Sequence, residues 1–185
     1  MHLAEAIRDA AVETNAVVQS VNPACFFDPS PCSDWDVQKL AEHMLLVAGL
    51  SIASARKTTF EPEPFDRDTW QDRYADLAAE LIDAWAEPGA MKGMTRSGTI
   101  EMDAQTAAAI TLQELVLHGW DLAAAVGYDY EPPAEVSAAV RRIVESGAKR
   151  ARDLGVFGPP VDVSTETDLG AAVAGSGRDP SWSPI

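Results

Sequence analysis

The chain has 185 residues, 46% of them hydrophobic and 23% charged, which predicts one globular domain and excludes both extended disorder and two full domains. A formal net charge of −15 argues against nucleic acid and against anionic membranes as partners. The sequence has no apolar run of the roughly 18 residues that a membrane span needs, and its N-terminus lacks the pattern of a secretory signal, so a cytoplasmic protein is expected.

Apolar residues recur with helical spacing along most of the chain, and proline and glycine mark the breaks between these segments. The predicted helices, in chain order, are 3–21, a second that starts near Asp36 and precedes a break at 58–66, then 68–85, 104–126 and 133–154. Residues 97–102 are expected to be a short extended piece, and 165–174 a short helix. The helix over 104–126 is apolar on nearly every side, so it should be the most buried one.

This pattern predicts an all-α fold, a helical bundle with added loop segments. The bundle should occupy residues 1–154, and residues 155–185 should form a C-terminal tail that lies on it, with Trp182 as an anchor. In the helix over 133–154, Val136, Val140, Ile143 and Leu154 are expected to face inward. Cys25 and Cys32 are expected to be reduced thiols, although a disulfide between them stays open as an alternative.

Polar residues interrupt the apolar stripe of the most buried predicted helix. Glu114 and His118 are four positions apart and Asp121 is three further on, so all three lie on one face. His43 lies at the edge of the buried face of the second helix. If the two helices are neighbours, His43, Glu114 and His118 converge. Two imidazoles and a carboxylate are the ligand set of many catalytic divalent-metal sites.

The spacing also allows a plainer interpretation. Glu114 and His118 could form a buried ion pair within the helix, with His43 as a core histidine that has its own partners, because the E-x-x-x-H pattern has many chance matches. The H-E-x-x-H helix of zinc peptidases is absent from the sequence, so peptidase chemistry is not supported.

Longer motifs around these residues resemble a known family. Residues 31–43 (PCSDWDVQKLAEH) resemble the opening of the DinB/YfiT-like superfamily, and more closely its actinobacterial branch related to the N-terminal domain of mycothiol-dependent maleylpyruvate isomerase. Residues 114–123 (ELVLHGWDLA) are similar to the second signature of that branch. Residues 157–161 (FGPPV) and 177–182 (GRDPSW) resemble the tail of its single-domain members.

The resemblance implies a DinB-like four-helix bundle in the up-down-down-up order and metal ligation by His43, Glu114 and His118. It implies a divalent metal, commonly zinc, that activates the thiol of a low-molecular-weight cofactor such as mycothiol; nickel also suits the ligand set. The isomerase has a further C-terminal domain, whereas only about thirty residues follow the last long helix here, too few for another domain. The metal-and-thiol site is therefore expected to carry over, and the isomerase reaction is not.

Neighbouring residues have two interpretations each. Asp121 could orient the His118 imidazole from behind, or hydrogen-bond a loop. Cys32 could be a fourth metal ligand that closes the site, or a small buried thiol. Arg96 is the best-placed cation for an anionic substrate, or an exposed arginine. Trp35 and Trp120 are expected to be packing residues, either of which could wall a pocket.

Three functional hypotheses follow. The first is a metal-dependent enzyme, a thiol transferase or isomerase, whose partners are a small-molecule substrate and a thiol cofactor. The second is a non-catalytic metal-stabilised bundle that binds a small ligand or a protein. The third is hydrolysis by a metal-activated water without a thiol. A homodimer is left open, since the pattern does not determine oligomeric state.

Overall fold

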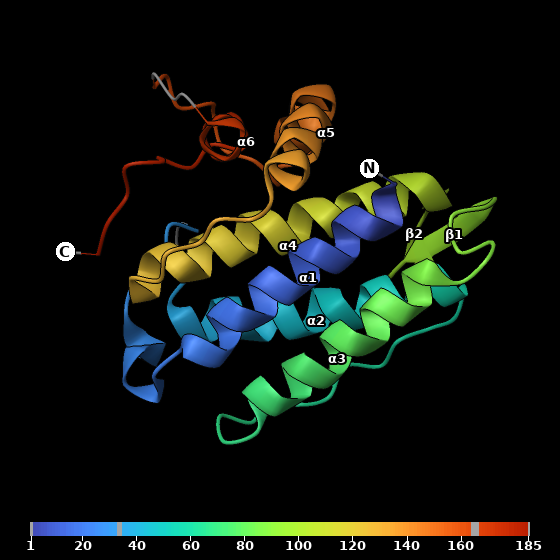
Figure 1. The fold of residues 1–185 in the computed structure, drawn as a ribbon, viewed down its shortest axis with the longest axis horizontal. Coiled ribbons are helices and arrows are strands. Elements are labelled where there is room, and N and C mark those ends of the chain that lie inside the picture. The colour runs from blue at the N-terminus through green and yellow to red at the C-terminus, as the bar shows by residue number, and fades with distance from the viewer. Residues whose placement is uncertain (1, 33–34, 164–166, 185) are drawn as a thin grey trace.

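The computed structural model of the chain describes residues 2–32, 35–163 and 167–184. Within these ranges the structure is helical apart from one small antiparallel hairpin (Figure 1). The elements are α1 (Leu3–Ser20), a short 3₁₀ helix η1 (Pro23–Phe27), α2 (Val37–Arg56), α3 (Trp70–Ala86), β1 (Met94–Ser97), β2 (Ile100–Asp103), α4 (Ala104–Val126), α5 (Ala134–Asp153) and α6 (Asp168–Gly175).

Helices α1 to α4 form the bundle. Helix α4 packs against α1 and α2, and α3 packs against the same two helices from the other side. Figure 1 shows that α1 and α4 run in one direction while α2 and α3 run in the opposite one. This is the up-down-down-up order, so the predicted fold class is confirmed. The long connection between α2 and α3 makes the two parallel helices compatible with one bundle.

The helix ends follow from local chemistry. The Asp36 side chain accepts a hydrogen bond from the backbone N–H of Lys39 at 2.8 Å and so caps the start of α2, as predicted. Asp103 caps α4 in the same way, through the N–H of Gln105. Gly127 takes a left-handed conformation, with φ of 71°, and ends α4 where a side chain would be strained.

The predicted extended piece at 97–102 is part of a hairpin. Strands β1 and β2 pair with Arg96 opposite Glu101, and Gly98 supplies the positive φ that the tight turn needs. The hairpin leads directly into α4.

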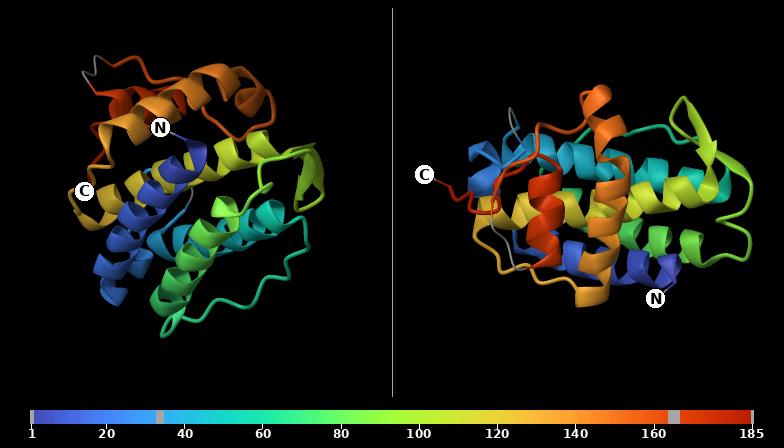
Figure 2. Two further views of the ribbon diagram at one scale, coloured as in Figure 1. Left: turned by 45° about the vertical axis from the view of Figure 1, so that its right-hand side comes forward. Right: turned by 90° about the horizontal axis from the view of Figure 1, so that it is seen from above.

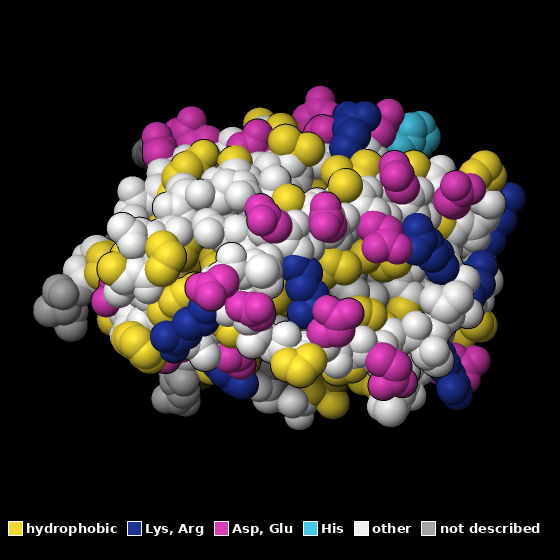
Figure 3. Space-filling model, turned by 90° about the horizontal axis from the view of Figure 1, so that it is seen from below, with side chains coloured by type: hydrophobic (Ala, Val, Ile, Leu, Met, Phe, Trp, Pro, Cys, Tyr) yellow, Lys and Arg dark blue, Asp and Glu magenta, His cyan; other side chains and the backbone are white. Residues whose placement is uncertain are grey.

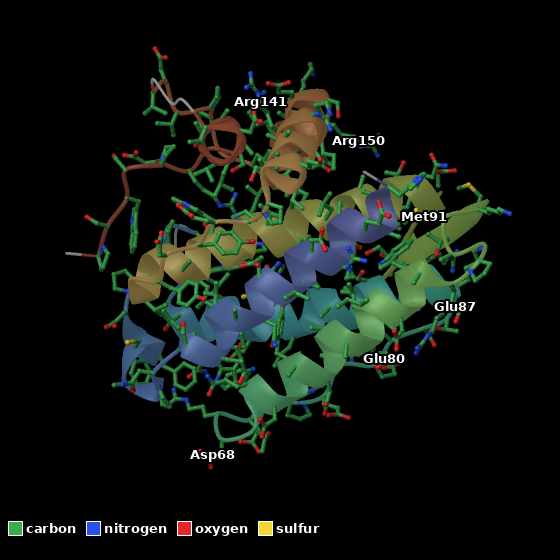
Figure 4. The ribbon with its side chains drawn as sticks, viewed as in Figure 1. Asp68, Glu80, Glu87, Met91, Arg141 and Arg150 are labelled. Atoms are coloured by element: carbon green, nitrogen blue, oxygen red, sulfur yellow. The ribbon has the colours of Figure 1, made fainter. Side chains whose placement is uncertain are left out.

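The C-terminal segment forms a second layer on the bundle. Helix α5 crosses α4 and α1, and α6 packs along α5, so that both lie on the side of α4 and α1 that faces away from α3 (Figure 2). Figure 4 shows Arg141 and Arg150 on this layer, on the opposite side of the molecule from Asp68 and Glu80. Trp182 is partly buried against the core. Of the predicted tail helix over 165–174, residues 165 and 166 lie outside the described residues.

One predicted core residue is wrong. Val136 and Val140 are fully buried in α5, as expected, but Leu154 is 67% exposed. The reason is that α5 ends at Asp153, and Gly155 with its φ of 72° turns the chain away before Leu154 can reach the core.

Helix α4 is the central helix, covered by α1, α2 and α5, as the sequence predicted. No described helix combines the length and the hydropathy that crossing a membrane requires. Acidic side chains are spread among Lys and Arg on the face shown in Figure 3, which fits the strongly negative composition.

Candidate metal centre

The bundle brings the three predicted ligands together. His43 comes from α2, and Glu114 and His118 from α4, because these two helices are neighbours. The Glu114 Oε2 atom lies 3.3 Å from His43 Nε2 and 3.1 Å from His118 Nε2. The ligand atoms of all three residues lie within 4.8 Å of one another.

These distances suit a divalent ion. Two ligand atoms that are each about 2.1 Å from a tetrahedrally coordinated ion lie roughly 3.4 Å apart. The observed separations of 3.1 and 3.3 Å are close to that value. The three side chains could therefore hold a divalent ion such as zinc.

Asp121 holds His118 in the orientation that a metal ligand needs. Its side chain is fully buried, and its Oδ2 lies 2.9 Å from His118 Nδ1. Because Asp121 is an acceptor, Nδ1 carries the proton and Nε2 is directed to Glu114 and His43. Both interactions open to Asp121 in the sequence are present, a hydrogen bond to the back of the His118 ring and hydrogen bonds from a loop residue, Arg178.

The cation beside the site is Arg178, which the sequence analysis did not single out. Its guanidinium donates to both carboxylate oxygens of Asp121 at 2.8–3.0 Å, and its Nη1 donates to Ser176 Oγ. The side chain is 10% exposed. Arg178 thus connects the C-terminal tail through Asp121 to His118. Its position in the GRDPSW motif was the available signal, but only the fold showed what it touches.

A close approach of two tail segments places Arg178. Gly177 has φ of 91°, and a Cβ atom there would come within 2.7–2.9 Å of the backbone of Gly158. A side chain at position 177 would therefore be strained and would also push the two segments apart. This close approach explains why a glycine precedes Arg178 in the motif.

Of the two interpretations of Arg96, the structure bears out the exposed arginine. It lies on β1 with an exposed side chain, and the surface hollow that it lines involves Lys57 and Glu101 instead of the predicted ligands. Segment 94–103 pairs with itself as a hairpin, which keeps Arg96 on the surface.

Cys32 lies close to the other side of the cluster. It forms a second group of ligand-type side chains with His118 and Asp121, again within 4.8 Å. Cys25 and Cys32 are both free thiols, as expected. Burial, and next the Asp121 charge, raise the pKa of Cys32 to about 11, so its thiol stays protonated at neutral pH. Ser33 and Asp34, which follow it, lie outside the described residues.

The ionisable side chains of the cluster shift one another's pKa values strongly. Burial acts to raise the pKa of Glu114, but its hydrogen bonds and charge interactions with His118 and His43 outweigh this and hold the pKa far below its ordinary value. Burial acts to lower the pKa of His118, but the hydrogen bonds to Asp121 and Glu114 outweigh this and raise it to about 9. His118 is thus protonated in the metal-free protein, and its imidazolium is the positive charge between the carboxylates of Glu114 and Asp121.

A cavity opens onto the cluster. Its volume is about 500 Å³, and its walls include the side chains of Cys32, His43, Glu114 and His118, with Arg178 and residues 155–158 of the tail on the other side. Trp35 also lines it, with its ring 4.7 Å from the His43 ring and 6.0 Å from the His118 ring, centre to centre. Trp35 and Trp120 both pack against the core, as expected, and Trp35 is in addition a wall of the pocket.

Comparison with known proteins identifies the family of the chain. Residues 7–123 match the family described as the mycothiol maleylpyruvate isomerase N-terminal domain. Two uncharacterized proteins of Mycobacterium tuberculosis, from strains CDC 1551 / Oshkosh and ATCC 25618 / H37Rv, are each 31% identical over 121 residues, which is 63% of this chain and 65% of theirs. The chain therefore matches slightly less than two thirds of the length of these relatives.

The fold also resembles solved structures. The crystal structure of the mycothiol-dependent maleylpyruvate isomerase aligns with a TM-score of 0.54 at 14% identity, over 78% of this chain and 70% of that one. A mutant of the same enzyme aligns with a TM-score of 0.55 over the same shares. At this identity the likeness shows the fold alone. The match over residues 7–123 shows that the chain belongs to the mycothiol maleylpyruvate isomerase N-terminal domain family.

Proposed function

We propose that this protein is a divalent-metal-dependent enzyme that activates a low-molecular-weight thiol, similar to mycothiol, for transfer to an electrophilic small molecule or for its isomerisation. The observation that carries the proposal is the convergence of His43, Glu114 and His118 on the wall of a 500 Å³ cavity. Such a site leaves room for a thiol beside the three ligand residues. Family membership supports the choice of a thiol cofactor.

Each residue has a task in this proposal. Glu114 supplies the negative charge, His43 and His118 the imidazole ligands, and Asp121 keeps the His118 proton on Nδ1 so that Nε2 is free to bind. A divalent ion in this site, zinc in the first place and nickel as an alternative, would lower the pKa of a thiol so that a thiolate forms at neutral pH. Cys32, with its raised pKa, is not suited to be that thiol.

A second candidate is a non-catalytic, metal-stabilised bundle that binds a small ligand or a partner protein. The nearness of Cys32 to His118 favours it, because a fourth protein ligand would close the site. The cavity beside the cluster favours the enzyme instead.

The test is the metal content of protein purified without an affinity tag, for the wild type and for His118→Ala, with His2→Ala as a histidine control far from the site. We expect about one equivalent of zinc in the wild type and the control, and loss of zinc in His118→Ala with unchanged helical circular dichroism. Absence of metal after incubation with zinc or nickel would rule out the three-ligand site.

The thiol is tested on the cobalt-substituted protein, with mycothiol as the probe. A thiol that binds in the site should produce thiolate-to-cobalt absorption, in the wild type and equally in Cys32→Ser. If that absorption is present without added thiol and disappears in Cys32→Ser, Cys32 is the fourth ligand and the non-catalytic bundle is correct.

Metal affinity should depend strongly on pH. His118 has a pKa of about 9 in the metal-free protein, so a proton competes with the metal for this residue at neutral pH. Zinc affinity should therefore rise about tenfold per pH unit between about pH 6 and 8, and level off above the His118 pKa. Competition titrations with a chelator of known pH dependence measure this. A flat profile would show that His118 releases no proton and is not a ligand.

A further inference from the structure

A second hollow begins at the same two residues, His43 and Glu114, but leads away from the tail. It lies between α2 and α4, with α3 beneath it, and has a volume of about 170 Å³. Its lining runs along α2 from His43 to Ser54 and along α4 from Glu114 back to Ala107, toward the hairpin. The candidate metal centre therefore stands between two separate spaces, the cavity under the tail and this hollow.

The walls of the hollow are mostly aliphatic. Its side chains include Met44, Val47, Ala48, Leu81, Ile110 and Leu115. Lysine and arginine do not occur among the described residues that line it, so no positive side chain is available for an anionic group. The charged residue at its mouth is Glu114, which would repel an anion.

Two of the hydroxyl groups that line the hollow, those of Ser51 and Thr111, are already engaged. Thr111 donates to the backbone oxygen of Ala107 at 3.0 Å, so the 2.7 Å contact between Ser51 and Thr111 is donated by Ser51. Ser51 in turn accepts from Trp85 Nε1 at 2.9 Å. The hydroxyl protons of Ser51 and Thr111 are thus used within the protein, while Ser54, Tyr74 and Ser97 also line the hollow.

The size of the hollow fits a small ring. An apolar protein cavity of about 150 Å³ is large enough to bind benzene. A hollow of about 170 Å³ with mostly aliphatic walls and no lysine or arginine among its described lining residues therefore matches a neutral group of that size.

We infer that the hollow between α2 and α4 receives a neutral apolar group about the size of a benzene ring, carried by the substrate of the candidate metal centre. That the ring belongs to a substrate rests on the proposed function. That the hollow binds such a ring rests on the hollow alone. It predicts that the electrophile is an aromatic or short branched aliphatic compound, whose reactive atoms stay at His43 and Glu114 while its apolar part points toward Ala107.

The experiment uses fluorobenzene as the probe, observed by fluorine NMR. Saturable binding is expected to the wild type, both metal-free and zinc-loaded. Ala107→Leu fills the hollow from α4 and should weaken binding about tenfold or more. Ala109→Leu makes the same change two positions along α4, at a residue that does not line the hollow, and should leave binding unchanged. If Ala107→Leu does not fold, Ala48→Leu fills the hollow from α2.

A cobalt-loaded sample tests the link to the metal centre. Fluorobenzene that binds in this hollow should relax faster with cobalt than with zinc, because its site adjoins His43 and Glu114. No saturable binding, or equal binding to wild type and Ala107→Leu, overturns the inference and leaves the proposed function intact. Saturable binding to a protein that takes up no metal on incubation with zinc, nickel or cobalt confirms the ring site and overturns the proposed function.

Discussion

Replacing Glu114 with glutamine should weaken zinc binding by about 100-fold or more, since one charged ligand among several accounts for a few kcal/mol of a structural zinc site's affinity. Glu114 is the residue that contacts both imidazoles, at 3.3 and 3.1 Å, so its carboxylate cannot be replaced by a neighbour. Glutamine has nearly the same shape, and the loss would therefore report on charge and ligation. Competition with a chelator at fixed pH gives the affinity.

Two variants make this result specific. Glu42→Gln is the same substitution next to His43, at a carboxylate whose partners are Lys39 and Gln38 instead of the cluster, and it should bind zinc like the wild type. Cys32→Ser should also leave the affinity nearly unchanged if the site has three protein ligands. A large loss in Cys32→Ser with little effect of Glu114→Gln would place the metal at Cys32, His118 and Asp121 instead.

Replacing Asp121 with asparagine should lower the free energy of unfolding by about 3–5 kcal/mol, the usual cost of leaving a buried charge without its partner. Asp121 is fully buried and is the carboxylate that Arg178 contacts, and Arg178 itself is only 10% exposed. The asparagine amide would also place an N–H₂ donor against the N–H donors of Arg178 or His118. Urea unfolding of the metal-free proteins measures the difference.

An exposed pair supplies the control for this prediction. Arg141 and Asp168 form an ion pair at 3.0 Å in which both side chains are 40% exposed or more. Asp168→Asn should therefore cost less than about 1 kcal/mol. The double variant Asp121→Asn with Arg178→Met should recover part of the loss, because it removes the unpaired charge. Equal effects of Asp121→Asn and Asp168→Asn would contradict the buried network.

Asp121→Asn should also weaken metal binding. Asp121 fixes which nitrogen of His118 carries the proton, and loss of such a partner typically weakens metal binding by about 10- to 100-fold. The tail is therefore coupled to the candidate site through Arg178 and Asp121, and metal binding should in turn stabilise the tail against proteolysis.

Local chemistry explains what the sequence determined by itself. Helical spacing predicted the bundle helices, and Asp36 marked the start of α2 because a helix cap depends on neighbouring residues alone. The common face of Glu114, His118 and Asp121 followed from the period of one helix. The addition of His43 needed one assumption, that α2 and α4 are neighbours, and the fold confirms it.

Tertiary contacts decided the rest. Arg178 meets Asp121 across 57 positions of sequence, a pairing that no local period contains. A hairpin turn decided between the two interpretations of Arg96, and Leu154 misses the core because α5 ends at Asp153 and Gly155 turns the chain away. The two spaces beside His43 and Glu114 are gaps left between the packed helices and the tail. Such gaps depend on packing in three dimensions and not on the order of residues.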